Sequence, residues 1–437
     1  MNTNSRRIRA GVLVLCLAVV PMRAAAEEGA ERKGIEEIER RQEILADEVR
    51  RLRDALVLPE TKELKSYYGL GPAASKVYTV ERGLSIGGYG ETNYRAAVAD
   101  KGSTRDQFDF VRFVLYVGYK YNDWIVLNSE TEFEHATTSS TTSSGSGEVS
   151  VEFATIDLLL DPRANARIGM VLVPMGFLNE IHEPPFYHGN VRPEVETQVL
   201  PSTWRANGFG LFGQPIDGLE YRTYGVTGLN AKGFSASNPR GTRQNGNREI
   251  AEDFAWVGRA DYTLLPGSLV GGAAYLGNSG QDQDFGGEKP SVFTQIYEAH
   301  AQVRVRGLEL RALGAVFDVD DADVLSAARL VEPNATVETI ADRMIGYYFE
   351  VAYDLMPLVL PGTTQYLAPW VRYSKVDTQD SVPSGFARNA SKDRDVYEVG
   401  VSYKPIPQVV LKVDYRNLDS AGADITDEFR AGAGFVF

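Results

Sequence analysis

Hydrophobic and polar residues alternate with a period of two over most of the chain after Leu84. Tyr297 and Ala299, for example, alternate with Glu298 and His300. Segments of about ten residues with one apolar and one charged face are typical of transmembrane β-barrels, whose strands separate lipid from an aqueous lumen. Strands of soluble β-sandwiches also alternate, but they are usually shorter. The pattern therefore predicts an all-β fold, an antiparallel transmembrane β-barrel.

The same pattern predicts sixteen strands, of which the sixth is the shortest and least regular. Their predicted ranges are 84–99, 106–121, 123–137, 147–161, 164–173, 207–213, 216–230, 252–265, 267–278, 291–306, 307–320, 343–356, 364–377, 393–404, 407–419 and 427–437. We expect the barrel domain to occupy residues 83–437.

The connections between these strands alternate in length. Tight turns are predicted at Asn122-Asp123, Asp161-Pro162, Gln214-Pro215, Pro266-Gly267, Arg306-Gly307, 357–362 and Lys404 to Pro407. Longer polar connections are predicted at 100–105, 138–146, 174–206, 231–251, 279–290, 321–342, 378–392 and 420–426. Short periplasmic turns and longer outer loops are how outer-membrane barrels are built. Both ends of the barrel are therefore expected at the periplasmic side.

The N-terminal segment 1–26 has the pattern of a cleaved signal peptide, with early arginines, the apolar run Gly11 to Val20 and the small residues Ala24 to Ala26. That run is too short for a membrane-spanning helix. Cleavage would remove four arginines, changing the formal net charge from −14 to −18, and the only cysteine, Cys16. The acidic balance argues against nucleic-acid binding, and the loss of Cys16 leaves no disulfide.

Residues 27–58 are charged and carry a heptad repeat. The repeat places Ile35, Ile38, Gln42, Leu45, Val49, Leu52 and Leu56 on one seam. This spacing predicts a periplasmic coiled-coil helix, in which Gln42 fixes register or oligomer state. The alternative is an amphipathic helix that lies on the barrel. Pro59 ends the repeat, and a linker is predicted over 59–82.

Two stretches carry a resemblance to a known family. The sequence Gly83 to Gly90 resembles the first strand of the phosphate-selective porin O and P type, and Arg167 to Gly176 resembles the fifth strand of that group running into its constriction loop. The resemblance extends over residues 80–437 and is architectural through most of that range. It implies a bacterial outer-membrane porin, a homotrimer in contact with lipid and lipopolysaccharide. The preceding coiled coil also resembles porins that are thought to take up dicarboxylates.

The last predicted strand is aromatic on one face and ends at Phe437. It resembles the C-terminal strand that the outer-membrane barrel assembly machinery reads in bacterial barrel proteins. That machinery is therefore an expected partner, and the resemblance supports the same compartment as the signal peptide.

In porins the third outer loop narrows the pore, and here the corresponding connection is 174–206, the longest in the predicted barrel. After its first residue it contains four prolines, Pro184, Pro185, Pro193 and Pro201, which stiffen it. A pore selects ions through the charges at its narrowest point. The candidate constriction residues are Glu180, His182, Glu183, His188, Arg192, Glu194, Glu196 and Arg205.

Strand parity places ten arginines on the lumen wall: Arg95, Arg112, Arg167, Arg222, Arg259, Arg304, Arg311, Arg372, Arg416 and Arg430. A guanidinium is charged at any working pH and suits carboxylate or phosphate oxygens, so such a wall would attract small anionic solutes. The alternative is that these arginines pair with acids on neighbouring strands and hold the polar interior together. An arginine wall facing an acidic loop would set a transverse field.

Other functions find less support in the sequence. No serine lies in a nucleophile elbow and no nucleophile–base pair is visible, so we expect neither an enzyme nor a cofactor. His182, Glu183 and His188 match no helical zinc motif, so no metal is predicted. The alternative to a passive porin is a structural anchor that tethers the outer membrane to the periplasm or cell wall through the coiled coil.

Overall fold

The computed structural model describes residues 37–38, 40–48, 64–98, 105–139, 145–331 and 337–437. Its chain divides into two units, Met1–Glu63 and Leu64–Phe437. In the first unit, residues 37–38 and 40–48 are helical; the predicted signal peptide and the rest of the predicted coiled coil lie outside the described residues. No helix in the described ranges is long and apolar enough to cross a membrane.

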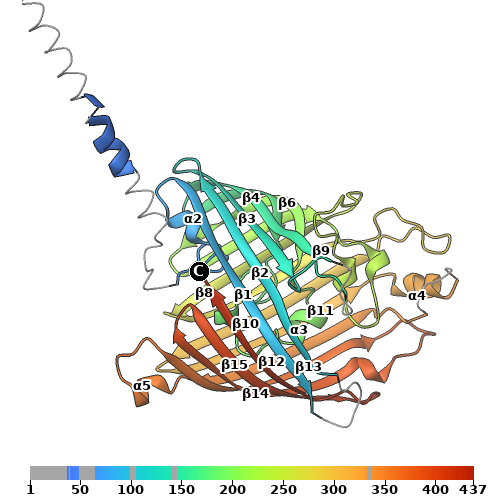
Figure 1. Ribbon diagram of the computed structural model, residues 1–437. Coiled ribbons are helices and arrows are strands. Elements are labelled where there is room, and N and C mark those ends of the chain that lie inside the picture. The colour runs from blue at the N-terminus through green and yellow to red at the C-terminus, as the bar shows by residue number, and fades with distance from the viewer. Residues whose placement is uncertain (1–36, 39, 49–63, 99–104, 140–144, 332–336) are drawn as a thin grey trace, which may run out of the picture. The chain divides into compact units, whose positions relative to one another are not determined.

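The second unit is a closed barrel of sixteen antiparallel strands (Figure 1), which confirms the predicted fold class. Strand β1 (Gly83–Ala97) pairs with β16 (Glu428–Val436) as well as with β2. The other strands are β2 (Gln107–Lys120), β3 (Ile125–Glu134), β4 (Val149–Asp161), β5 (Ala164–Leu172), β6 (Arg205–Ile216), β7 (Leu219–Thr227), β8 (Phe254–Leu265), β9 (Ser268–Asn278), β10 (Phe293–Val305), β11 (Leu308–Val319), β12 (Arg343–Tyr353), β13 (Tyr366–Ser381), β14 (Asp393–Ile406) and β15 (Val409–Ser420).

The prediction for the sixth strand was wrong in its bounds, because β6 continues through the predicted turn at Gln214-Pro215. The tight turn is made by Asp217 and Gly218 instead, and Gly218 has a φ of +81° that a residue with a side chain rarely adopts. Pro215 fits in the strand because the pairing with β7 is irregular at this point, where the ladder does not need its missing N–H.

Some connections that the sequence predicts as irregular contain regular structure. Strand β13 runs to Ser381, inside the predicted loop 378–392. Helix α4 (Ala322–Val331) begins the loop after β11, and the short helix α5 (Met356–Val359) overlaps the predicted turn 357–362. The apolar side of α4 is buried through Leu325 and Ala328, so tertiary packing stabilises a helix that a polar loop prediction does not anticipate.

The two faces of the strands separate apolar from polar side chains, as the alternation predicts. On β14, Val399 and Val401 are exposed on the outside, whereas Glu398 and Ser402 are buried on the inside. The connections form two rims. We call the rim with the short connections, such as 217–218 and 306–307, the turn rim, and the rim with the long ones the loop rim.

The predicted linker 59–82 is part of the barrel interior from Leu64 onward. We call residues 64–82 the inner segment; it includes helix α2 (Lys76–Thr79). Leu70, Ala74 and Val77 are buried, and the Asn128 side chain donates a hydrogen bond of 2.9 Å to the Ala74 carbonyl. The small apolar residues of this stretch pack on lumen-facing aromatic residues near the turn rim, so it does not act as a free spacer.

Candidate pore constriction

The third loop, residues 173–204, connects β5 to β6 and folds into the lumen. It contains a 3₁₀ turn η1 (Pro184–Phe186) and helix α3 (Val195–Gln198). Helix α3 lies against β12 at Gly346, where an added Cβ would come within 3.0 Å of the Val199 side chain. The absence of a side chain at Gly346 therefore lets the loop approach the wall closely.

Three of the predicted loop acids fasten the loop rather than face open water. Glu196 accepts hydrogen bonds from the Leu178 amide at 2.7 Å and from the Tyr348 hydroxyl at 2.8 Å. Glu183 accepts from the Ala73 amide of the inner segment at 2.9 Å. Glu180 pairs with Arg222 of the wall, with 3.1 Å between Oε2 and Nε.

Two more predicted loop residues, His188 and Arg205, make equally specific contacts. His188 stacks with the rings of Tyr366 and Trp370, and its Nδ1 lies 3.2 Å from the Ser402 hydroxyl. Arg205 donates to Glu152 at 2.9 Å. The structure therefore does not bring His182, Glu183 and His188 together: Glu183 is turned to the inner segment and His188 to β13 and β14.

A cavity of about 400 Å³ opens between the loop and the wall near the loop rim; we call it the loop-side cavity. Arg192 and Glu194 are the predicted loop residues that line it. Its cationic lining residues are Arg95, Arg112, Arg192, Arg240, Arg416 and Arg430, and its acidic ones are Glu91, Asp109, Glu134 and Glu194. The lining thus carries more cations than acids.

A second cavity, of about 290 Å³, lies on another face of the loop, against β7 to β11 near the turn rim; we call it the turn-side cavity. Ser66 and Gly69 of the inner segment form part of its lining, together with Glu180 of the loop. Its charged wall residues are Glu220, Arg222, Arg259, Asp261, Arg304 and Arg311. Both cavities are bounded by the third loop, as expected if that loop narrows the lumen.

The structure places all ten predicted wall arginines inside the barrel, and nine of them form ion pairs with acids. The partners are Glu428 for Arg95, Glu91 and Glu132 for Arg112, Asp157 for Arg167, Glu180, Glu220 and Asp261 for Arg222, Asp261 for Arg259, Glu309 for Arg304, Glu350 and Glu398 for Arg372, Glu194, Glu398 and Glu428 for Arg416, and Glu428 for Arg430. Arg311 instead bonds to Gln302 at 2.9 Å and to the Phe186 carbonyl at 3.2 Å.

Arg192 and Arg240 differ from the nine paired wall arginines because neither forms an ion pair with any described residue. Arg240 lies on η3 (Arg240–Thr242) of the loop after β7 and donates to the Ser202 hydroxyl at 3.1 Å. Burial, followed by the neighbouring charges of Arg192 and Arg112, lowers the pKa of Arg240. Arg192 and Arg112 therefore lie close enough to Arg240 to lower its pKa, and Glu134 and Glu152 offset their charge only in part.

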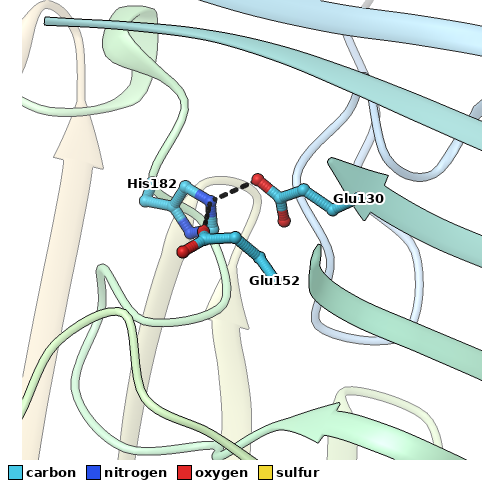
Figure 2. Close-up of side chains that lie close together, drawn as sticks. All are labelled: Glu130, Glu152 and His182. Atoms are coloured by element: carbon cyan, nitrogen blue, oxygen red, sulfur yellow. Dashed lines mark hydrogen bonds and ion pairs between the residues drawn. The ribbon is translucent and has the colours of Figure 1, made fainter. Parts of the chain in front are cut away.

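His182 of the third loop lies beside two glutamates of the wall, Glu130 on β3 and Glu152 on β4 (Figure 2). Its Nε2 is 3.1 Å from Glu130 Oε1 and 3.7 Å from Glu152 Oε2. On the loop, outside the strands, burial lowers the pKa of His182 to about 4 and raises the pKa of Glu183 to about 8. Both pKa values shift in these directions because a group removed from water is less stable in its charged form.

Comparison with known proteins identifies one relative by sequence. An uncharacterized protein of Aquifex aeolicus (strain VF5) is 36% identical over 393 residues, which cover 89% of this chain and 87% of the relative. The chain belongs to the same family as this protein. No protein-family model matches the chain, so the resemblance to the phosphate-selective porins stays a prediction.

Solved structures show the porin fold. OmpF of Salmonella typhi, in complex with daunomycin, aligns with 82% of this chain and 98% of its own, with a TM-score of 0.54 and 15% identity. The anion-selective porin from Comamonas acidovorans aligns with 82% of this chain and 100% of its own, with a TM-score of 0.50 and 12% identity. At these identities the likeness shows the shared barrel fold alone.

Sequence reasoning missed two charged residues of the lumen, Arg240 and Glu152. Arg240 comes from the fourth long loop, whose path into the lumen leaves no periodic signal. Strand parity did not place Glu152 in the lumen because this residue is the extra residue of a β-bulge. Glu130 pairs with Phe153 and Thr131 pairs with Val151, so Glu152 has no partner in the register. A bulge turns two successive side chains to one face, which strict alternation cannot anticipate.

Proposed function

We propose that this protein is an outer-membrane porin, a passive diffusion channel for small hydrophilic solutes that prefers anions such as phosphate or carboxylates. The fold supports the channel, because the porin-like barrel encloses charged cavities on both sides of a folded-in loop. The periodicity and loop lengths support an outer-membrane location with the turn rim toward the periplasm.

The observation that carries the anion preference is the pair of arginines, Arg192 and Arg240, that line the loop-side cavity without an ion pair among the described residues. The wall arginines contribute less to the anion preference because most of them are paired with acids, as the alternative interpretation of the sequence expects. An anion at this cavity would meet guanidinium groups whose planar donors suit carboxylate or phosphate oxygens.

Single-channel recording in planar bilayers tests the channel itself. Purified protein should give discrete conductance steps, and the reversal potential in a salt gradient should show anion preference. A protein that gives no steps is not a porin, and a reversal potential of the opposite sign would refute the anion preference alone.

Replacing Arg192 or Arg240 by Ala should reduce anion preference. A unit charge about 5 Å from a permeating ion contributes about 0.8 kcal/mol in water, or about a fourfold change in local ion concentration. We therefore expect the anion-to-cation permeability ratio to fall by up to about that factor. Arg163→Ala is the matched control, since Arg163 lies exposed in the turn after β4 and pairs with Asp161. An unchanged ratio in both lumen variants would contradict the proposal.

The proposal also covers the oligomeric state, the partners and the absence of catalysis. We propose that the protein forms a homotrimer in contact with lipid and lipopolysaccharide and has no catalytic activity. We also propose that the barrel assembly machinery recognises β16. The comparisons give no support to the alternative of a structural anchor.

A further inference from the structure

Glu130, Glu152 and His182 converge on one buried point in the constriction (Figure 2). They come from β3, β4 and the third loop, and their relative exposures are 0%, 1% and 2%. Each offers one metal-ligating atom, and these atoms all lie within 4.8 Å of one another. Two carboxylates and one imidazole form a mixed oxygen and nitrogen donor set.

The tautomer of His182 is set by its other nitrogen. His182 Nδ1 lies 3.1 Å from the Asn179 carbonyl oxygen, which can only accept a hydrogen bond, so Nδ1 carries the proton. In a neutral imidazole, Nε2 then presents its lone pair to both carboxylates. A backbone carbonyl on the outer nitrogen is the usual way in which proteins orient a metal-binding histidine.

The described residues supply too few hydrogen-bond partners for the carboxylates of Glu130 and Glu152. Glu130 Oε2 and Glu152 Oε2 are buried and have no hydrogen-bond partner among the described residues. Arg205 binds the other oxygen of Glu152, and Arg112 binds the adjacent Glu132, but no described arginine forms an ion pair with Glu130. Burying charge without compensation is costly, so the arrangement favours an additional positive group between the three side chains.

The spacing fits a single small ion. Ligand atoms about 2.1 Å from a tetrahedral Zn²⁺ lie about 3.4 Å from one another, and the two distances from His182 Nε2, 3.1 and 3.7 Å, bracket that value. Imidazole with carboxylates suits first-row transition metals such as Zn²⁺, whereas Ca²⁺ and Mg²⁺ prefer oxygen ligands alone.

We propose that Glu130, Glu152 and His182 bind one divalent transition-metal ion that fastens the third loop to β3 and β4. The ion would hold the constriction in place from its buried side. The proposal concerns metal binding, and it holds or fails whether or not the barrel conducts anions.

A second buried histidine shows what distinguishes this site. His300 Nε2 lies 2.8 Å from Asp261 and its Nδ1 lies 2.9 Å from Glu298. The two carboxylates there bond to different ring nitrogens on opposite edges of the ring, so they cannot meet one ion together with a single nitrogen. His300→Gln is therefore the matched control for His182.

The test measures Zn²⁺ bound by the full-length protein in detergent, after prolonged dialysis against a chelator and re-equilibration with Zn²⁺ alone. We expect wild type and His300→Gln to retain one ion per chain by elemental analysis. Glu130→Gln, Glu152→Gln and His182→Gln should each bind more than about tenfold more weakly, since even outer-shell partners are worth 10- to 100-fold in affinity.

Folding of each variant is checked by the migration of the unheated barrel in denaturing gels, and the glutamine variants keep the side-chain volume. Anomalous X-ray scattering at the zinc edge should place the ion between the three side chains. A wild-type protein that binds no Zn²⁺ would overturn the proposal, as would folded Glu130→Gln and Glu152→Gln variants that bind it as tightly as wild type. Either result would leave a proton, shared between the carboxyl groups and the imidazole, as the compensating charge.

Discussion

At the scale of single residues, the lumen contains two classes of arginine. Arg372 represents the first: its guanidinium is fully buried and binds Glu350 at 2.5 Å and Glu398 at 2.9 Å. Arg192 represents the second, because it lines the loop-side cavity without an ion pair among the described residues. The first class holds the wall together, and the second is available to a permeating anion.

Replacing Arg372 by Ala should therefore destabilise the barrel strongly. The change leaves Glu350 without its arginine and removes one of the two arginines that bind Glu398, and breaking a buried pair on one side typically costs about 3–5 kcal/mol. Guanidinium-induced unfolding in detergent micelles, followed by tryptophan fluorescence, measures the loss. Arg192→Ala is the control and should change the free energy of unfolding by less than about 0.5 kcal/mol. If Arg372→Ala and Arg192→Ala were equally stable, the two classes of arginine would not differ in their contribution to stability.

At the scale of elements, the inner segment and the third loop support each other inside the barrel. The Ala73 amide donates to Glu183 of the loop, and the Tyr78 hydroxyl of the inner segment donates to Asp157 of β4 at 2.6 Å. Because the inner segment lines the turn-side cavity, we infer that its position sets how wide that part of the lumen is.

Gly71→Val should displace the inner segment and raise the single-channel conductance. An added Cβ at Gly71 would lie 2.5 Å from Glu183 Oε1 and 2.7 Å from its carboxyl carbon, so either the Glu183 carboxylate, which binds the Ala73 amide, or the segment itself must shift. Gly225→Val is the control, since an added Cβ there meets nothing within 4 Å. Conductance that is unchanged in Gly71→Val would show that the segment does not limit ion flow.

At the scale of the whole molecule, the barrel depends on the pairing of its first and last strands. Beyond the last residue of β16, Phe437 exchanges backbone hydrogen bonds of 2.9 and 3.1 Å with Gly88 of β1. Its ring stacks on Phe113, with 6.2 Å between centroids. The closing seam is therefore secured next to the turn rim by the final residue of the chain.

Deleting Phe437 should lower the stability of the folded barrel. Two backbone hydrogen bonds contribute about 1–3 kcal/mol together, and the loss of the ring contact adds to this. The temperature at which the folded band disappears in denaturing gels measures the effect. Phe429→Ala, at the loop-rim end of the same strand, is the control and removes no closing hydrogen bond. A deletion variant as heat-resistant as wild type would show that closure does not depend on Phe437.

The sequence by itself determined the barrel, the number of strands and the inward direction of the ten wall arginines. These follow from local rules, because the contrast between lipid and water imposes a period of two on every strand. The sequence also indicated that residues 174–206 form the constriction, since no other connection is as long.

Only the tertiary structure decided which charges neutralise one another. Ion pairs depend on strand register and on the path of the loops, so Glu183 meets the inner segment and Arg240 reaches the cavity from a different loop. The bulge in β4 turns Glu152 inward beside Glu130, while the third loop brings His182 to both. Ligands that come from three separate segments have no spacing that a sequence motif could show, because only the folded chain sets the distances between them.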